Sequence, residues 1–323
     1  MPEAKKEQVL SVRDLDITFK TTAGPVHAIR GVNIDLYKGE TVALVGESGS
    51  GKSVTMKAAM GILAKNATVN SGSIRFSYHH ADGSPETVDL LQKDKKWIRR
   101  HINGKRIAMV FQDPMASLNP RKKVEDIIGE GLDIHHLCKT QAERREKVEK
   151  ILAKVGLAPE HAERYPHQFS GGQRQRVGIA RALIMNPKLI IADECISALD
   201  VSIQAQVVNL MKDIQQETGT AYLFIAHDLS MVKYISDRIG VLHLGHLLET
   251  GTTEEIFEHP IHPYTRSLLS AIPLPNPVVE KRRVAETYDY AASGIDYSLG
   301  TSHHVAGSHY VKCTDAEFAQ WCR

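Results

Sequence analysis

The fold of this chain is decided by the stretch Gly46-Glu47-Ser48-Gly49-Ser50-Gly51-Lys52-Ser53. An apolar, β-branched run at 41–45 precedes it, and residues 54–63 have the spacing of a helix with one buried side. Strand, loop and helix in this order form the context of a P-loop, whose backbone N–H groups converge on phosphate oxygens. The sequence therefore predicts a nucleoside triphosphate site, with Lys52 at the β- and γ-phosphates and the Ser53 hydroxyl on Mg²⁺. A Gly/Ser-rich turn without a ligand is the disfavoured alternative.

The composition is that of a soluble globular protein with one large or two modest domains. The chain has 323 residues, of which 42% are hydrophobic and 24% are charged. Its net charge of +2 gives no electrostatic argument for nucleic acid as a partner. No window approaches about eighteen apolar residues, and the N-terminus lacks the apolar core of a signal peptide. We therefore expect a cytosolic protein that reaches a membrane only through other proteins.

The cysteines and the C-terminal tail offer little metal chemistry. Four cysteines are scattered without a C-x-x-C pair: Cys138, Cys195, Cys313 and Cys322. Reduced thiols are expected, with neither a disulfide framework nor a zinc site. Three histidines lie near the last two cysteines: His303, His304 and His309. The Gly, Ser and Tyr content of this tail predicts an irregular, exposed segment, and a metal site there is disfavoured because the ligand spacing is missing.

The N-terminal segments predict strands and then a surface insertion. Residues 9–19 and 26–36 alternate apolar and polar residues around a break at Gly24-Pro25, which predicts a hairpin. Phe19 is either a core aromatic or a platform that stacks on a purine, and the sequence leaves both open. From 69 to 106 the pattern loosens, and we expect a solvated surface insertion with one short strand at 73–78. The basic run inside it is not favoured as a nucleic-acid patch, since charge runs usually solvate a face.

The next segments predict a further strand and a helical region. Residues 107–111 form an apolar strand that ends at Gln112, a position expected to face the ligand crevice. Residues 116–165 are mainly helical, with a capping-box signature at Thr140 and Glu143. They are expected to form a helical subdomain inserted in the sheet.

A second candidate phosphate site begins at Ser170. This serine is a plausible N-cap, and Gly171 and Gly172 would expose backbone donors at the start of a helix. The helix is expected to run through Met185, because Asn186-Pro187 ends it. Taken alone, this signal is weak.

Two carboxylates and a histidine follow buried strands. Residues 188–192 form an apolar strand that delivers Asp193 and Glu194, a Walker B arrangement. Asp193 would hold Mg²⁺ and Glu194 would polarise the attacking water, with a structural ion pair as the disfavoured alternative. Another buried strand at 221–226 presents His227 on the crevice side, where it can reach the γ-phosphate.

In this order, the motifs resemble those of the nucleotide-binding subunits of ABC transporters. The resemblance spans roughly residues 9–250, and its Ser-Gly-Gly-Gln element is lacking in P-loop kinases and small GTPases. It rests on 46–53, Gln112, 170–173, Asp193-Glu194, 197–200 and His227. It implies an α/β fold: a P-loop NTPase core at 1–250 with an N-terminal antiparallel β subdomain and an α-helical subdomain inserted at about 116–180, followed by a C-terminal extension at 251–323.

The resemblance also implies the residues that bind ATP and Mg²⁺. The catalytic residues would be Glu194, His227, Gln112 and Lys52, and the Mg²⁺ ligands Ser53, Gln112 and Asp193. The nucleotide would contact Phe19, Gly46, Glu47, Ser48, Gly49, Ser50, Gly51, Lys52, Ser53, Gln112, Asp193, Ser170, Gly171, Gly172, Gln173 and Asp200. In that family the signature at 170–173 binds the γ-phosphate of ATP held by the partner subunit, so two such domains close head to tail around two nucleotides.

A closer resemblance is to the oligopeptide-importer ATPases, and within them to the F-type subunit of a Gram-positive system. It is carried by 111–114, 117–120, 169–176, 181–183, 197–206, 222–230, 259–265 and the tail near 273–284. The early helix at 56–63 is instead similar to the D-type partner. Cys195 stands where the family usually has proline, so we expect a looser turn with both carboxylates in place. Many relatives carry a cysteine-rich tail fit for an iron–sulfur cluster, whereas Cys313 and Cys322 are too few for four thiolate ligands.

The implied function is that of an ATPase subunit powering oligopeptide import at the cytoplasmic face of the plasma membrane. Its implied partners are a second homologous ATPase, as a heterodimer, two transmembrane permease subunits and, indirectly, an extracellular substrate-binding protein, with no nucleic acid. Alternatives are an importer of dipeptides, nickel or a glycosylated compound, and a regulatory subunit without turnover, suggested by Cys195 alone. A soluble ABC ATPase of DNA repair or translation would need a coiled-coil insertion or a second cassette, which the sequence lacks.

Overall fold

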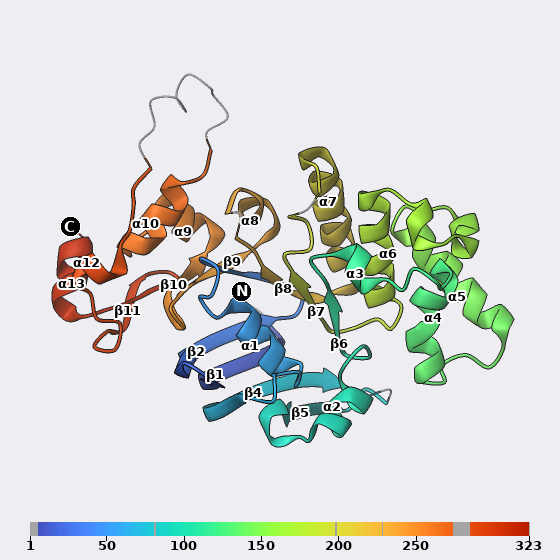
Figure 1. The fold of residues 1–323 in the computed structure, drawn as a ribbon, viewed down its shortest axis with the longest axis horizontal. Coiled ribbons are helices and arrows are strands. Elements are labelled where there is room, and N and C mark those ends of the chain that lie inside the picture. Colours follow the sequence, from blue (N-terminus) through green and yellow to red (C-terminus); the bar gives the residue numbers. More distant parts are fainter. Residues whose placement is uncertain (1–5, 81, 198, 228, 274–284, 323) are drawn as a thin grey trace, which may run out of the picture.

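Two β-sheets form the centre of the chain, with helices gathered at both ends of its long axis (Figure 1). The computed structural model describes residues 6–80, 82–197, 199–227, 229–273 and 285–322. Three parts of the predicted motifs lie outside these ranges: Ala198, Asp228 and 274–284.

The larger sheet has eight strands in the order β11-β12-β10-β9-β3-β8-β7-β6. Its strands are β3 (Thr41–Val45), β6 (Ile107–Val110), β7 (Leu189–Asp193), β8 (Ala221–Ile225), β9 (Arg238–His243), β10 (His246–Thr252), β11 (Thr301–Ala306) and β12 (His309–Cys313). β3 pairs in parallel with β8 and β9, and β7 pairs in parallel with β6 and β8. The carboxyl ends of these strands therefore meet at one edge, where the loop 46–53, Gln112, Glu194 and His227 follow them.

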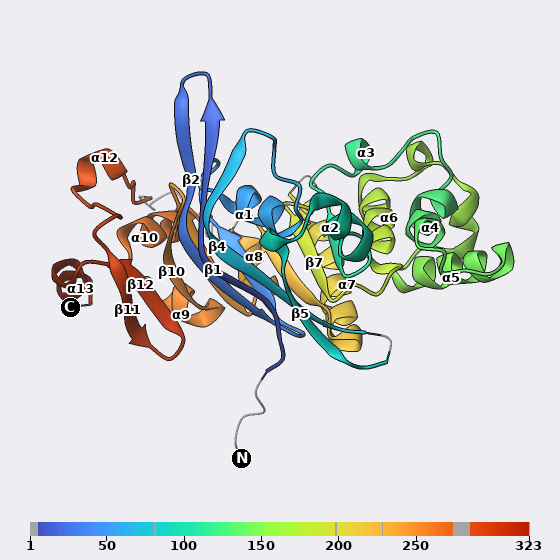
Figure 2. The same cartoon turned by 90° about the horizontal axis from the view of Figure 1, so that it is seen from below.

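The smaller sheet is antiparallel, in the order β2-β1-β4-β5. Its strands are β1 (Gln8–Thr21), β2 (Gly24–Tyr37), β4 (Ala67–His79) and β5 (Pro85–Asp89). The hairpin of β1 and β2 was predicted, and Figure 2 shows its tip projecting from the molecule.

The prediction of a solvated insertion at 69–106 is wrong. β4 pairs with β1 over most of its length, and β5 extends the same sheet. A short helical turn η1 (Leu90–Gln92) and helix α2 (Lys95–His101) follow. Seven apolar side chains of this segment are buried: Ile74, Phe76, Tyr78, Val88, Leu90, Ile98 and Ile102. The polar residues between them face outward, as expected for a sheet with one covered face.

Helix α1 (Lys52–Ala59) packs between the sheets and is shorter than the helix predicted at 54–63. It ends at Met60, because Gly61 takes the left-handed conformation with φ +63°. Met60 is buried as predicted, whereas Leu63 is only partly buried.

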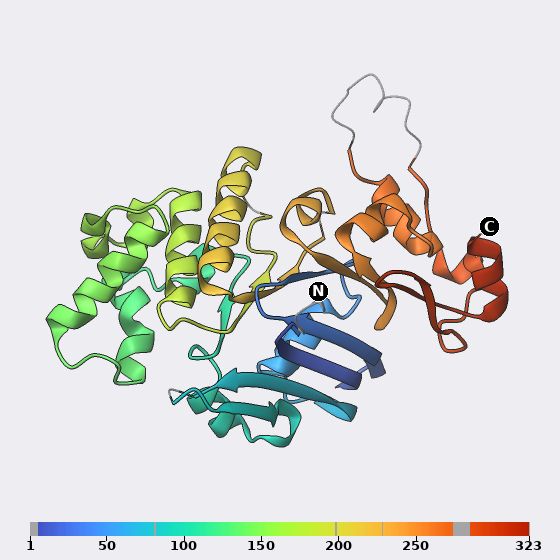
Figure 3. The same cartoon turned by 180° about the vertical axis from the view of Figure 1, so that it is seen from behind.

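A group of helices stands at the β6 end of the larger sheet (Figures 1 and 3). Its elements are α3 (Pro114–Ser117), α4 (Val124–Ile134), α5 (Gln141–Lys154), η2 (Pro159–Glu163), η3 (Pro166–Gln168), α6 (Gly171–Leu183) and α7 (Val201–Thr218). Helix α8 (Leu229–Ile235) follows β8 and lies nearer the middle of the molecule (Figure 1). Thr140 caps α5 by accepting from the Glu143 N–H, but the Glu143 carboxylate accepts from Lys139 instead of closing the predicted capping box. α6 ends two residues before the predicted Met185.

The C-terminal residues lie at the opposite end of the long axis (Figure 3). Their helices are α9 (Thr253–Glu258), α10 (Pro263–Ser270), α12 (Tyr290–Ser293) and α13 (Asp315–Trp321). The prediction of an irregular, exposed tail is wrong, because β12 pairs with β10 and buries Val311 and Cys313. Within the described ranges, every helix is either too short or too polar to cross a bilayer.

Candidate functional site

The loop 46–53 connects β3 to α1 and owes its shape to two glycines. Gly46 has φ +141°, and a Cβ there would lie 2.0 Å from the carbonyl oxygen of Leu242 in β9. Gly51 has φ +109°, and a Cβ there would lie 2.8 Å from the carbonyl oxygen of Ala28 in β2. Only glycine fits such close approaches at positive φ. Both sheets therefore fix the path of the loop.

Lys52 turns back over this loop. Its Nζ donates to the carbonyl oxygens of Gly46 at 2.6 Å and Glu47 at 2.8 Å, and to the Ser50 hydroxyl at 3.3 Å. The side chain is buried, and burial lowers its pKa, while the two carboxylates after β7 act in the opposite direction. The ammonium group thus lies inside the loop, where a phosphate group would be cradled.

Asp193 ends β7 beside the start of α1. Burial and the neighbouring Glu194 charge raise the pKa of its carboxyl group overall, and the nearby Ser53 hydroxyl acts in the opposite direction. A hydroxyl and a carboxylate near each other offer the oxygen ligands that Mg²⁺ prefers. These two residues fit the predicted metal site.

Glu194 stands between two other predicted catalytic residues. Its Oε2 accepts from Gln112 Nε2 at 2.8 Å and lies 3.5 Å from His227 Nδ1. Its backbone has φ +45°, a region that few residues other than glycine adopt, and its N–H donates to the Ile225 carbonyl at 3.0 Å. This bond to β8 holds the carboxylate at the strand ends.

Residues 170–173 have no hydrogen bond to the loop 46–53 among the described residues. Ser170 Oγ accepts from the Gln173 N–H at 3.3 Å, and Gln173 Oε1 accepts from the Ser170 N–H at 3.0 Å, a complete capping box at the start of α6. Ser170 and Gly171 are exposed, and Gly172 is half-buried. The structure therefore brings together the loop, both carboxylates, Gln112 and His227, and leaves 170–173 on the surface of the helical group.

Comparison with known proteins shows the family. The family described as "ABC transporter" matches residues 29–197, and the one described as "Oligopeptide/dipeptide transporter, C-terminal region" matches 248–293. The chain belongs to the ABC transporter ATP-binding proteins. Its relatives include the oligopeptide transport ATP-binding protein OppF of Bacillus subtilis (strain 168), 52% identical over 97% of this chain and 98% of the relative. The dipeptide transport ATP-binding protein DppF of Lactococcus lactis subsp. cremoris is 50% identical over 98% of this chain and 97% of the relative.

Solved structures support the same assignment. A dimeric ATP-binding cassette, MJ0796, in a post-hydrolysis state bound to ADP and Pi, has a TM-score of 0.64 at 25% identity, covering 76% of this chain and 98% of that chain. CbiO1 of Clostridium perfringens, part of an ABC transporter complex, has a TM-score of 0.64 at 28% identity, covering 79% and 92%. The α/β fold of an ABC ATPase is thus confirmed, and so is ATP hydrolysis coupled to transport.

Three predicted or unusual residues lie outside this cluster. Phe19 is half-buried, pairs with Val26 and Ala67 across the sheet, and packs on the core of the N-terminal strands. Asp200 is exposed at the N-cap of α7 and makes no side-chain cap. Cys195 is buried, and burial raises the pKa of its thiol to about 12. The roles of Phe19 and Asp200 remain predictions.

One contact to the loop of this ABC ATPase comes from the C-terminal residues and was not predicted. The Glu47 N–H donates to the hydroxyl of Tyr264 in α10 at 2.8 Å. Tyr264 belongs to the stretch 259–265, which contributed to the family resemblance without any assigned contact. The sequence does show a tyrosine in that stretch. It does not show which residue the tyrosine contacts, because the two hydrogen-bonded residues are 217 positions apart.

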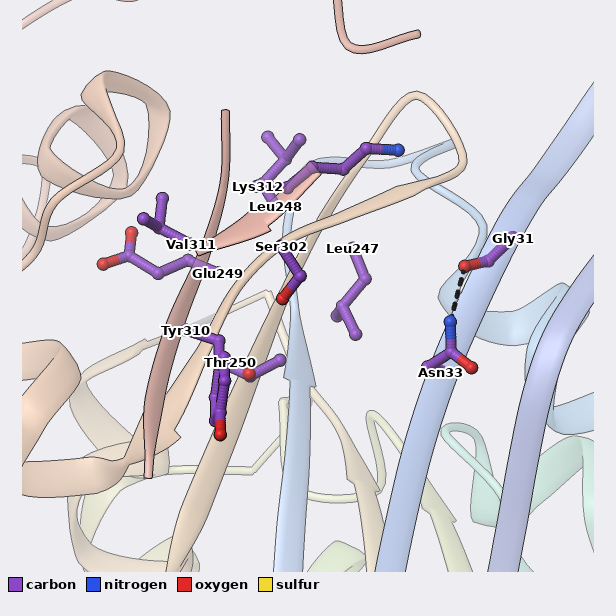
Figure 4. A pocket seen from close by; sticks show the side chains of 10 residues that line it. All are labelled: Gly31, Asn33, Leu247, Leu248, Glu249, Thr250, Ser302, Tyr310, Val311 and Lys312. Atoms are coloured by element: carbon purple, nitrogen blue, oxygen red, sulfur yellow. Dashed lines mark hydrogen bonds between the residues drawn. The ribbon is translucent and has the colours of Figure 1, made fainter. Parts of the chain in front are cut away.

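A cavity of about 230 Å³ lies elsewhere, between β2 and the strands β10 and β12 (Figure 4). Leu247, Tyr310 and Lys312 are among its lining residues, and Asn33 donates to the Gly31 carbonyl at its edge. None of the predicted site residues lines it. It is distinct from the cluster around the loop 46–53.

Proposed function

We propose that this ABC ATPase powers oligopeptide uptake across the plasma membrane and works as one half of an ATPase dimer. The observation that carries the proposal is a separation within one chain. Lys52, Asp193 and Glu194 lie together at the strand ends, whereas 170–173 lie at the surface of the helical group and make no hydrogen bond to the loop among the described residues. A second subunit, turned head to tail, would bring its own 170–173 to this loop. The dimeric MJ0796 cassette supports such an arrangement.

We assign the chemical roles from the geometry. Lys52 Nζ, held at the Gly46 and Glu47 carbonyls, would reach the β- and γ-phosphates of ATP from inside the loop. Ser53, Gln112 and Asp193 would hold Mg²⁺, which would supply positive charge beside the phosphate oxygens. Glu194 accepts the proton of the attacking water, since a carboxylate at the strand ends is placed for general-base work.

The remaining site residues complete the nucleotide site. His227, which lies 3.5 Å from Glu194, reaches toward the γ-phosphate. Gln112, which is hydrogen-bonded to Glu194, senses the γ-phosphate and couples its presence to the position of the helical group. Phe19 stacks on the adenine ring, while 170–173 and Asp200 act on the nucleotide of the partner subunit. The division into an ATPase domain at 1–250, with its helical subdomain at about 116–180, and an extension at 251–323 is part of the same proposal.

The names of the relatives support the proposed cargo and the proposed partners. Bacillus OppF is named for oligopeptide transport, and Lactococcus DppF for dipeptide transport. We propose a second homologous ATPase and two permease subunits as direct partners, an extracellular substrate-binding protein as an indirect one, and a place at the cytoplasmic face of the membrane. Import of dipeptides, nickel or a glycosylated compound is the alternative. The neighbouring genes test this choice: the ligand bound by a substrate-binding protein encoded among them would separate these cargoes.

The test is the Glu194→Gln variant in the reconstituted transporter. ATP binding should be retained, because Lys52 and the loop are unchanged, while ATP turnover should fall by about 10²- to 10⁴-fold. Glu217→Gln is the matched control, since Glu217 is an exposed residue at the end of α7 that pairs only with Lys154 among the described residues. Normal turnover by Glu194→Gln would rule out the base assignment. The Lys52→Ala variant separates an ATPase subunit from a regulatory subunit without turnover of its own. If the loop 46–53 hydrolyses ATP, this variant loses transport-coupled ATP turnover. If the subunit is only regulatory, turnover continues.

A further inference from the structure

The C-terminal extension reaches the nucleotide loop through one hydroxyl group. Tyr264 lies in the first turn of α10, is buried, and accepts the Glu47 N–H at 2.8 Å. Its ring fills the core, a task that phenylalanine would also perform. The hydroxyl group makes the hydrogen bond to the loop, so a phenylalanine at this position would remove the acceptor of the Glu47 N–H.

The peptide bond that Tyr264 contacts is also the one that holds Lys52. The amide between Gly46 and Glu47 donates through its N–H to Tyr264 and accepts through its carbonyl from Lys52 Nζ at 2.6 Å. Because a peptide unit is planar, fixing its N–H fixes the direction of its carbonyl. At Gly46 the backbone passes so close to β9 that a Cβ would lie 2.0 Å from the Leu242 carbonyl oxygen.

Tyr264 is itself held in place by aromatic and histidine side chains. Its ring stacks on His243, with centroids 4.1 Å apart and planes at 24°. His243 Nδ1 in turn lies 2.8 Å from the Tyr297 hydroxyl. The Tyr264 N–H donates to His262 Nδ1 at 3.0 Å, which sets the start of α10.

A buried carboxylate fastens this part of the extension to the sheet. Glu249 in β10 accepts from the N–H groups of Ile261 at 2.7 Å and His262 at 3.0 Å, and pairs with His309 Nε2 at 2.7 Å. The Glu249 side chain is fully buried. The position of the Tyr264 hydroxyl is therefore set by β10 and the extension, independently of the loop it contacts.

We propose that Tyr264 is a positioning residue for ATP binding, whose hydroxyl group orients the Gly46–Glu47 peptide and thereby places Lys52 Nζ. The inference rests on the proposed function, in which the loop 46–53 binds the triphosphate. It gives the extension a task within the ATPase reaction, because a displacement of α10 would change how tightly the loop binds ATP.

The test is the Tyr264→Phe variant of the full chain, titrated with mant-ATP and Mg²⁺ and assayed in the reconstituted transporter. The affinity for mant-ATP should fall about fivefold, the scale of one lost hydrogen bond, and the KM for ATP should rise by a similar factor with kcat nearly unchanged. Tyr310→Phe is the matched control, since it removes a tyrosine hydroxyl group from an exposed position of β12 in the same extension. Equal affinity for Tyr264→Phe and wild type, or an equal loss in both variants, would overturn the proposal.

Two further measurements separate the possible failures. Lys52→Ala should abolish mant-ATP binding, so a Lys52→Ala protein that binds normally contradicts the proposed function, whereas a failure of Tyr264→Phe alone contradicts only the positioning role. If Tyr264→Phe does not fold, amide hydrogen exchange on the wild-type chain tests whether the Glu47 N–H is bonded to Tyr264. The Glu47 amide should be protected like those of β3, and rapid exchange there would refute the bond.

Discussion

Replacing Gly46 by alanine tests how the nucleotide loop is built. The new Cβ would lie 2.0 Å from the Leu242 carbonyl oxygen, whereas ordinary contact begins at 3.4 Å, so the loop or β9 must move by 3.4 − 2.0 = 1.4 Å. The backbone at φ +141° adds strain of about 1–3 kcal/mol, and the overpacking adds a further 1–3 kcal/mol. The smaller entropy of the unfolded alanine chain offsets less than about 1 kcal/mol. We expect a net loss of about 3 kcal/mol.

Gly49→Ala is the matched control for this substitution. Gly49 lies in the same loop with φ +83°, but a Cβ there meets nothing within 4 Å. Its cost is therefore the backbone strain alone, and the two variants should differ by about 2 kcal/mol, the overpacking term. Urea denaturation of each full chain without nucleotide measures the difference as a shift of the midpoint. If Gly46→Ala were as stable as Gly49→Ala, the close approach of the loop to β9 would not constrain it.

Two predictions concern buried groups elsewhere. Iodoacetamide at pH 8 should modify exposed Cys322 well before Cys195 and Cys313, because burial raises the pKa of both buried thiols to about 12. Mass spectrometry measures the rate of modification at each cysteine, and equal rates would contradict this prediction. Burial also lowers the pKa of His262 to about 3, so below about pH 6.5 the unfolded chain binds a proton that the folded chain does not. The stabilisation by neutral His262 is complete above pH 6.5 and is lost as the pH falls, so acidification to pH 5 should lower Tm. In the His262→Gln variant Tm should fall less steeply with pH. An equally steep fall of Tm in this variant would contradict the prediction.

The local parts of the site could be predicted from the sequence. The loop 46–53, the strand before Asp193 and the N-cap at Ser170 each depend on residues within a few positions of one another. Spacing alone therefore fixes which elements carry them, and the convergence of Gln112, Glu194 and His227 follows from the parallel order of the strands.

The parts that were missed depend on pairing between distant segments. β4 contains serines and an asparagine that weaken its alternation, and only its register with β1 shows which side chains become buried. The tail forms β11 and β12 because the edge of β10 is available to them. The bond from Glu47 to Tyr264 likewise requires the position of α10 in three dimensions. Long-range packing of this kind leaves no local signal.

The central claim is that this chain contains only half of a working ATP site, and the turnover of the purified subunit tests it most directly. The initial rate of ATP hydrolysis per subunit would be measured against protein concentration, first alone and then with the homologous ATPase subunit added. We expect slow turnover alone and a marked rise when the partner supplies its own signature to the loop 46–53. Brisk turnover by the monomer that does not depend on concentration would contradict the claim.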